Sequence, residues 1–73
     1  METIYIIKMF KYDGVKKEYD MSIIPEGFRT FESALSFLKN TSKEDFHETK
    51  EFRTYSEDYG RRKYSIIAVH IFD

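Results

Sequence analysis

The sequence predicts a small α+β domain, in which a four-stranded, mostly antiparallel sheet of order β-β-α-β-β carries one helix on one face. Three observations predict this class: an Asp13-Gly14 turn between two strand-like segments, a helical repeat after Thr30, and a strand-like segment over 63–72. The chain of 73 residues is long enough for one domain, spanning 1–73, and too short for two.

The first hairpin is predicted by strand-like composition on both sides of Asp13-Gly14. Residues 3–12 are rich in β-branched and aromatic side chains, and the return strand covers 15–23. Asp-Gly favours a two-residue type I′ turn, which would pair Tyr12 with Val15. The return strand has one polar face, as edge strands do, whereas the first strand is apolar on both faces. The first strand is therefore expected inside the sheet.

A helix is predicted to begin after Thr30, which is a good N-cap residue. Apolar side chains then repeat at helical spacing, at Phe31, Ala34, Leu35 and Leu38. Asn40-Thr41-Ser42 ends the pattern. The polar segment that follows, 43–51, fits a short second helix or a surface loop.

Two more strands are predicted after this segment, over 52–57 and 63–72, with a turn near 58–60. The last strand is apolar on both faces, so it is expected beside the first strand in the middle of the sheet.

One helix of about ten residues covers only one face of such a sheet, so the second apolar face needs another cover. Two covers fit: the segment 43–51 folding back, or a protein partner, with a two-fold homodimer as the default form. The candidate partner-binding residues are Tyr5, Ile7 and Met9 of the first strand and Tyr59, Arg61, Arg62 and Lys63 of the last turn.

The charge balance argues against partners that are recognised by charge alone. Twelve Lys and Arg stand against thirteen Asp and Glu, so no net field attracts nucleic acid or an anionic membrane. Nucleic-acid binding through the basic Arg61-Arg62-Lys63 hairpin, which has tyrosines nearby, is the alternative function. The absence of Cys favours a reducing, cytoplasmic location, and the apolar run 4–7 is too short for a membrane span.

The sequence contains no catalytic, cofactor or metal motif, so we expect no enzyme, no cofactor and no metal site. His47 would share a face with Glu44 and Glu51 only on a helix, and a solvated polar face is the simpler interpretation. His70, in the last strand, is expected to be a hydrogen-bonded structural residue.

In length and composition the chain resembles the small uncharacterised proteins of phages and prophages of low-G+C Gram-positive bacteria, of the Bacillus type. The resemblance rests on the short length without Cys or Trp and on the Ile-, Lys-, Tyr- and Phe-rich runs 4–12 and 64–72. It implies a role in binding a host protein. The leading hypothesis is therefore a small non-enzymatic protein-interaction module, with the homodimer as one form.

Overall fold

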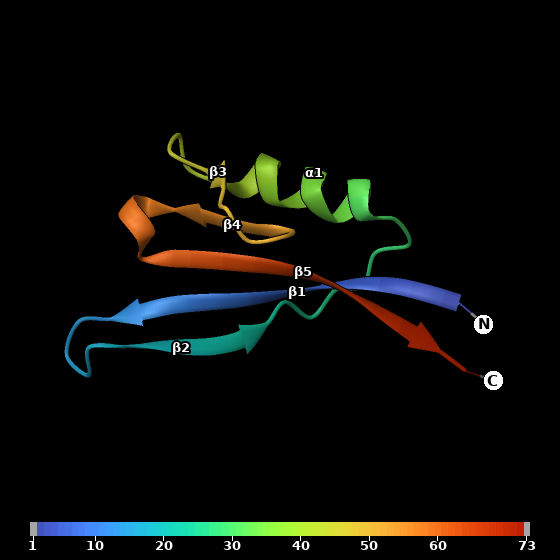
Figure 1. Cartoon of the computed structure of the whole chain (residues 1–73), viewed down its shortest axis with the longest axis horizontal. Helices are drawn as coiled ribbons and strands as arrows, with labels where there is room; N and C mark the ends of the chain where they lie inside the picture. The colour runs from blue at the N-terminus through green and yellow to red at the C-terminus, as the bar shows by residue number, and fades with distance from the viewer. Residues whose placement is uncertain (1, 73) are drawn as a thin grey trace.

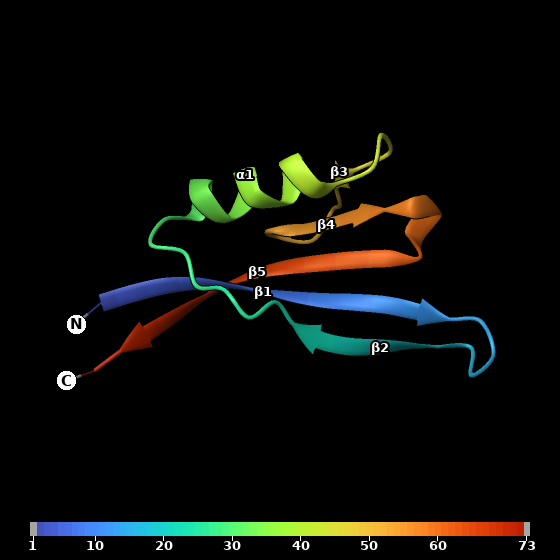
Figure 2. The same cartoon turned by 180° about the vertical axis from the view of Figure 1, so that it is seen from behind.

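The computed structural model describes residues 2–72 and consists of a five-stranded antiparallel sheet with one helix against one face (Figure 1, Figure 2). The strands are β1 (Glu2–Asp13), β2 (Glu18–Ile23), β3 (His47–Glu48), β4 (Thr54–Glu57) and β5 (Arg62–Ile71). The helix α1 spans Phe31–Thr41, and a short 3₁₀ helix, η1, spans Asp58–Gly60. The strand order is β2-β1-β5-β4-β3.

The predicted count of four strands is wrong, because the polar segment 43–51 contributes a fifth strand. This strand, β3, pairs with Tyr55 and Ser56 of β4. The residue before it, Phe46, stacks on the Tyr55 ring with the ring centroids 5.4 Å apart. That contact brings the next two residues alongside β4, although their polar side chains carry no strand signal.

The expected pairing of the first and last strands is confirmed, and it forms the longest ladder of the sheet. β1 and β5 pair from Glu2 opposite Ile71 to Lys11 opposite Arg62. β2 joins the outer edge of β1, and β4 joins the outer edge of β5. The chain after β2 continues along β1, where Tyr5 and Phe28 exchange two backbone hydrogen bonds of 2.7 and 2.9 Å.

The predicted two-residue turn at Asp13-Gly14 is wrong, because β1 and β2 are joined by a four-residue loop from Gly14 to Lys17. A type I′ turn needs positive φ at both central residues, and here Lys17 alone in the loop has one, at 57°. The Asp13 carboxylate instead accepts hydrogen bonds from the backbone N–H groups of Val15 and Lys16. Tyr12 therefore lies opposite Tyr19 and not opposite Val15.

This change of register moves β2 by an even number of residues, so every side chain keeps its predicted face. Residues opposite one another in an antiparallel ladder share a face. The odd-numbered side chains of β2 and β5 therefore lie on the same face as the even-numbered side chains of β1.

The helix covers the other face, which carries the odd-numbered side chains of β1. Thr30 caps α1 as predicted, because its hydroxyl oxygen accepts a hydrogen bond of 3.1 Å from the Ser33 N–H. Ala34 and Leu38 are the buried residues of the helix. The buried hydrophobic core comprises Ile7, Ala34, Leu38, Tyr55, Tyr64 and Ile66.

Replacing Lys17 with Gly tests the four-residue loop. We expect Lys17→Gly to raise the free energy of unfolding by about 0.5–1 kcal/mol, because Gly adopts positive φ without the steric cost that Lys incurs. Urea unfolding followed by circular dichroism measures this change. Val15→Gly is the control and should lower stability, since Val15 does not have positive φ. A two-residue turn would place Lys17 in a strand, and Lys17→Gly would then destabilise the protein.

Candidate functional site

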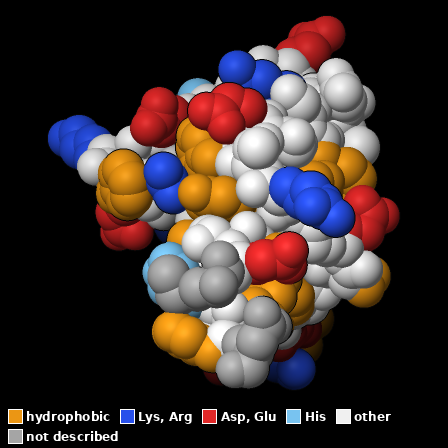
Figure 3. All heavy atoms as spheres, turned by 90° about the vertical axis from the view of Figure 1, so that its right-hand side faces the viewer, with side chains coloured by type: hydrophobic (Ala, Val, Ile, Leu, Met, Phe, Trp, Pro, Cys, Tyr) orange, Lys and Arg blue, Asp and Glu red, His pale blue; other side chains and the backbone are white. Residues whose placement is uncertain are grey.

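The candidate site is the apolar face of the sheet turned away from α1, which we call the open face. Strand alternation places its hydrophobic side chains on three adjacent strands: Ile4, Ile6, Phe10, Tyr12, Tyr19, Met21, Ile23, Ile67, Val69 and Ile71. Met21 and Ile23 are 54% and 51% exposed. Where both termini lie, hydrophobic side chains reach the surface in several places between charged groups (Figure 3).

Three of the predicted partner-binding residues lie on the opposite side of the sheet, beneath α1. Ile7 is fully buried, and Tyr5 and Met9 pack against the core. The Tyr5 ring meets Phe31 of the helix edge to face, with the centroids 6.3 Å apart. These residues belong to the protein's own core, and the apolar surface left for a partner is the other face.

The predicted turn residue Tyr59 is held at the end of the molecule and is 91% exposed. Both Asp58 and Tyr59 adopt left-handed backbone conformations, with φ of 53° and 56°. The Asp45 carboxylate accepts hydrogen bonds from the backbone N–H groups of Tyr59 and Asp58, at 2.7 and 2.9 Å. These bonds lower the pKa of Asp45 and anchor the turn.

The three predicted basic residues do not form one patch, because strand alternation separates them. Arg62 lies on the helix side of the sheet, 4.0 Å from the Glu57 carboxylate. Lys63 lies on the open face, with its ammonium 5.0 Å from the centre of the Tyr19 ring. Arg61 is exposed beyond the end of η1.

The end of the open face near η1 is an aromatic cluster that joins the two turns of the sheet. The rings of Tyr12 and Tyr19 meet at 5.3 Å between centroids. The Tyr19 hydroxyl donates a hydrogen bond of 2.8 Å to the carbonyl of Gly60, and the Tyr12 N–H donates one of 2.7 Å to the carbonyl of Arg61.

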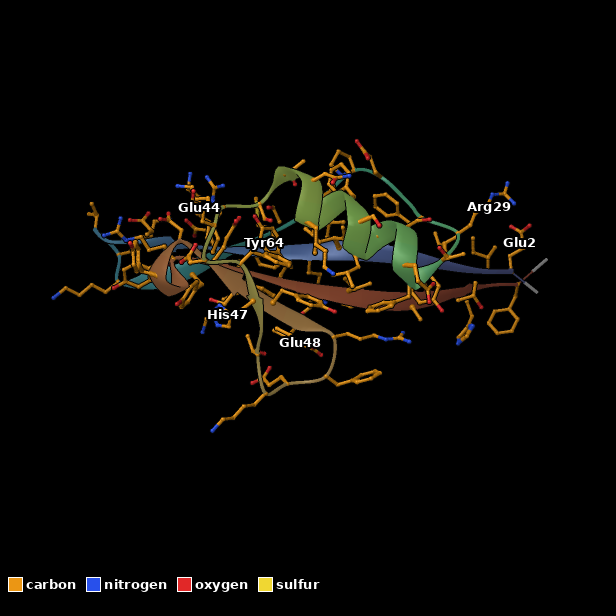
Figure 4. All side chains as sticks on the ribbon, turned by 90° about the horizontal axis from the view of Figure 1, so that it is seen from above. Glu2, Arg29, Glu44, His47, Glu48 and Tyr64 are labelled. Atoms are coloured by element: carbon orange, nitrogen blue, oxygen red, sulfur yellow. The ribbon has the colours of Figure 1, made fainter. Side chains whose placement is uncertain are left out.

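Beside this cluster the open face is hollowed by a cavity of about 250 Å³. Its lining combines aromatic, hydroxyl and charged side chains: Phe10, Tyr19, Glu51, Thr54, Lys63 and Ser65. One wall is the loop between β3 and β4, which lies on the side of the sheet opposite α1 (Figure 4). Only the end of segment 43–51 therefore reaches the open face, and it leaves Met21 and Ile23 uncovered.

The two histidines are exposed, and each has one hydrogen-bond contact. His47 is in an edge strand and not on a helix, and its Nδ1 lies 2.9 Å from the carbonyl oxygen of Asp45. Glu44 and His47 extend in different directions (Figure 4). Among residues 2–72 no three His, Asp or Glu side chains are grouped as a metal site requires. His70 is hydrogen-bonded as expected, with Nδ1 3.1 Å from the Thr3 hydroxyl.

Sequence reasoning missed a buried carboxylate, Glu57, which is 1% exposed. It accepts hydrogen bonds from the Tyr64 hydroxyl and from the Lys43 N–H, the latter at 2.7 Å. Burial raises the pKa of Tyr64 to about 12, and the neighbouring Glu57 carboxylate adds to the shift. Because Glu57 is enclosed and hydrogen-bonded, it ties the end of α1 to β4 and β5 and has no access to a substrate.

Comparison with known proteins gives no match: no family model, no curated protein and no solved structure is similar to this chain. No helix within residues 2–72 has the length and apolar character needed to cross a membrane.

Replacing Tyr64 with Phe tests the structural role of Glu57. We expect Tyr64→Phe to lower the free energy of unfolding by about 1–3 kcal/mol, because the buried carboxylate loses a hydrogen-bond donor. Tyr55→Phe is the matched control. No hydrogen bond joins the Tyr55 hydroxyl to another group of residues 2–72, and because no buried hydroxyl there lacks a partner, this one reaches solvent and its removal should cost less than about 0.5 kcal/mol. Equal losses in the two variants, measured by urea unfolding, would contradict this role.

The raised pKa of Tyr64 also predicts an alkaline transition. The neutral phenol stabilises the fold fully below pH 10, the ordinary pKa, and this contribution is lost as the pH rises towards 12. The free energy of unfolding of the wild-type protein should therefore fall over this range. The Tyr64→Phe variant should show a smaller fall, and an equal fall in both proteins would contradict the assignment.

Proposed function

We propose that this chain is a small non-enzymatic protein-interaction module whose open face binds the open face of a second copy. One observation carries the proposal: α1 covers one apolar face of the sheet, whereas on the other face Tyr12, Tyr19, Met21, Ile23 and Ile71 are exposed. Soluble monomers rarely leave a contiguous apolar surface of this kind in water, and such surfaces mark protein contacts.

The dimensions of the molecule leave room for a dimer interface on the open face. The molecule extends 43 Å and 25 Å along its two longest axes, and the sheet lies in this plane (Figure 1). A standard interface buries about 800 Å² on each partner, which a face of these dimensions accommodates. Two sheets packed face to face at about 10 Å would bury their side chains as in a β-sandwich.

The charge distribution also permits self-association. The net charge is −1, so two copies repel one another little. Lys8 and Lys63 are charged groups of the open face that an interface there must accommodate, and the Lys63 ammonium already lies over the Tyr19 ring at the end near η1. A dimer of two copies related by a two-fold axis buries both open faces against each other and leaves none free for a third copy.

Two other partners compete with a second copy for this face. The resemblance to phage proteins implies a host protein, and the chain without Cys fits a cytoplasmic setting for either protein partner. A single-stranded nucleic acid would use the aromatic cluster with Lys63. The division of Arg62 and Lys63 between opposite faces favours a protein, because it leaves no continuous basic path for a phosphate backbone.

Charged substitutions on β2 test the proposal directly. Met21→Lys and Ile23→Lys should each raise the dimer dissociation constant by about tenfold or more, because a lysine would be buried in the interface. Sedimentation velocity between 1 and 100 µM measures the constant. Both side chains are about half exposed, so the monomer should keep its fold.

The control is Ser22→Lys, which changes the same strand on its other face and should leave association unchanged. Circular dichroism should give the same spectrum for all three variants. If Met21→Lys and Ile23→Lys associate as the wild type does, the open face is not the interface. Retention of single-stranded DNA or RNA by the wild type in a gel shift at low salt, without self-association, would favour the nucleic-acid alternative.

A further inference from the structure

The loop between β3 and β4, residues 49–53, stands away from the sheet on the side of the open face (Figure 4). Two adjoining cavities, of about 220 and 250 Å³, are lined by Glu51 of this loop together with Thr54 and Lys63 of the sheet. Phe52, the fourth residue of the loop, is 83% exposed. The open face is therefore bordered by a raised wall along one side that presents an unburied aromatic ring.

The position of this 49–53 loop is fixed by contacts at its ends. The Arg53 guanidinium lies 4.3 Å from the centre of the Phe31 ring and 4.9 Å from the centre of the Phe52 ring. The Arg53 carbonyl accepts a hydrogen bond of 3.0 Å from the Ile66 N–H, and the Thr49 N–H donates one of 2.9 Å to the Thr54 carbonyl. A loop held in this way presents Phe52 with little entropy left to lose on binding.

The raised loop restricts how two open faces can meet. In a face-to-face dimer the two-fold axis lies in the plane of the interface. Two limiting directions are an axis across the strands and an axis along them. An axis across the strands brings like edges together, so both 49–53 loops lie along the same side of the dimer, and they meet and hold the sheets apart when the axis passes at their height. An axis along the strands exchanges the two edges, so the loop of each copy meets the β2 edge of the other.

We propose that the 49–53 loop of each copy clasps the β2 edge of the other and places Phe52 against Met21 and Ile23. This inference rests on the proposed self-association. It accounts for three exposed apolar side chains at once, since Phe52 is 83%, Met21 54% and Ile23 51% exposed in the single chain.

The positions along the strands agree with this arrangement. Ile23 lies opposite Lys8, and Lys8 lies opposite Ser65. Ser65 in turn lies opposite Thr54, the first residue after the loop. The loop and Ile23 are therefore at the same height along the strands, and an axis parallel to the strands preserves that height.

Disulfide trapping tests the arrangement, because the chain has no cysteine of its own. The double variant Ile23→Cys/Phe52→Cys, oxidised under mild conditions, should give a covalent dimer on a non-reducing gel. Within one chain β2 and β4 are three strand spacings apart, about 15 Å, which is too far for an internal disulfide. Ile23→Cys/Phe72→Cys is the matched control, since Phe72 is also exposed but lies outside the clasp, and it should remain largely uncrosslinked.

The possible outcomes separate this inference from the proposed function. A wild-type protein that sediments as a monomer contradicts both. A wild-type dimer in which the single variant Phe52→Cys is trapped as completely as the Ile23→Cys/Phe52→Cys pair shows that the two loops meet each other, which overturns the clasp and leaves self-association intact. A wild-type dimer in which neither is trapped also overturns it.

A second measurement does not depend on cysteine chemistry. Phe52→Ala should raise the dimer dissociation constant by about tenfold, as the loss of a central aromatic contact does. Phe72→Ala should change it by less than about twofold. Equal effects of the two substitutions, measured by sedimentation with circular dichroism as the check on folding, would overturn the clasp.

Discussion

The antiparallel ladder between β1 and β5 is the pairing on which the rest of this protein depends. It runs from Glu2 opposite Ile71 to Lys11 opposite Arg62, with β2 on its β1 edge and β4 on its β5 edge, and β3 is added outside β4. Both strands are apolar on both faces, so the ladder needs a cover on each side. The helix α1 covers one side through Ala34 and Leu38. The open face is the other side of the same ladder, where hydrophobic side chains remain exposed.

Much of the fold is predictable because its signals are local. Thr30 begins the helix through a side-chain hydrogen bond that is typical of an N-cap threonine. The apolar pattern on both faces of β1 and β5 identifies them as neighbours inside the sheet. β3 was not predicted because it is two residues long and polar, and the contact that holds it beside β4, the stacking of Phe46 on Tyr55, is not visible in the sequence pattern. Lys17 carries no signal for its positive φ, so Asp13-Gly14 predicted the hairpin but not its register.

The sequence predicts that one apolar face of the sheet lacks a helix, but it does not show which face this is. Period-two alternation shows that β1 has two apolar faces, but it does not show which one the helix covers. That choice is made by the connection from β2 to α1, which pairs Phe28 with Tyr5, and by aromatic packing of Tyr5 on Phe31. Ile7 is therefore core, whereas Met21 on the neighbouring strand stays at the surface. Phe52 had no sequence signal, because its significance lies in a loop that stands off the sheet.

The most direct test of the account is the mass of the wild-type protein in solution. The chain has a mass of 8.8 kDa. If the open face binds a second copy, sedimentation equilibrium at tens of micromolar should give about twice that mass, and the apparent mass should fall towards 8.8 kDa on dilution. A mass of 8.8 kDa at every concentration up to 100 µM would contradict the account.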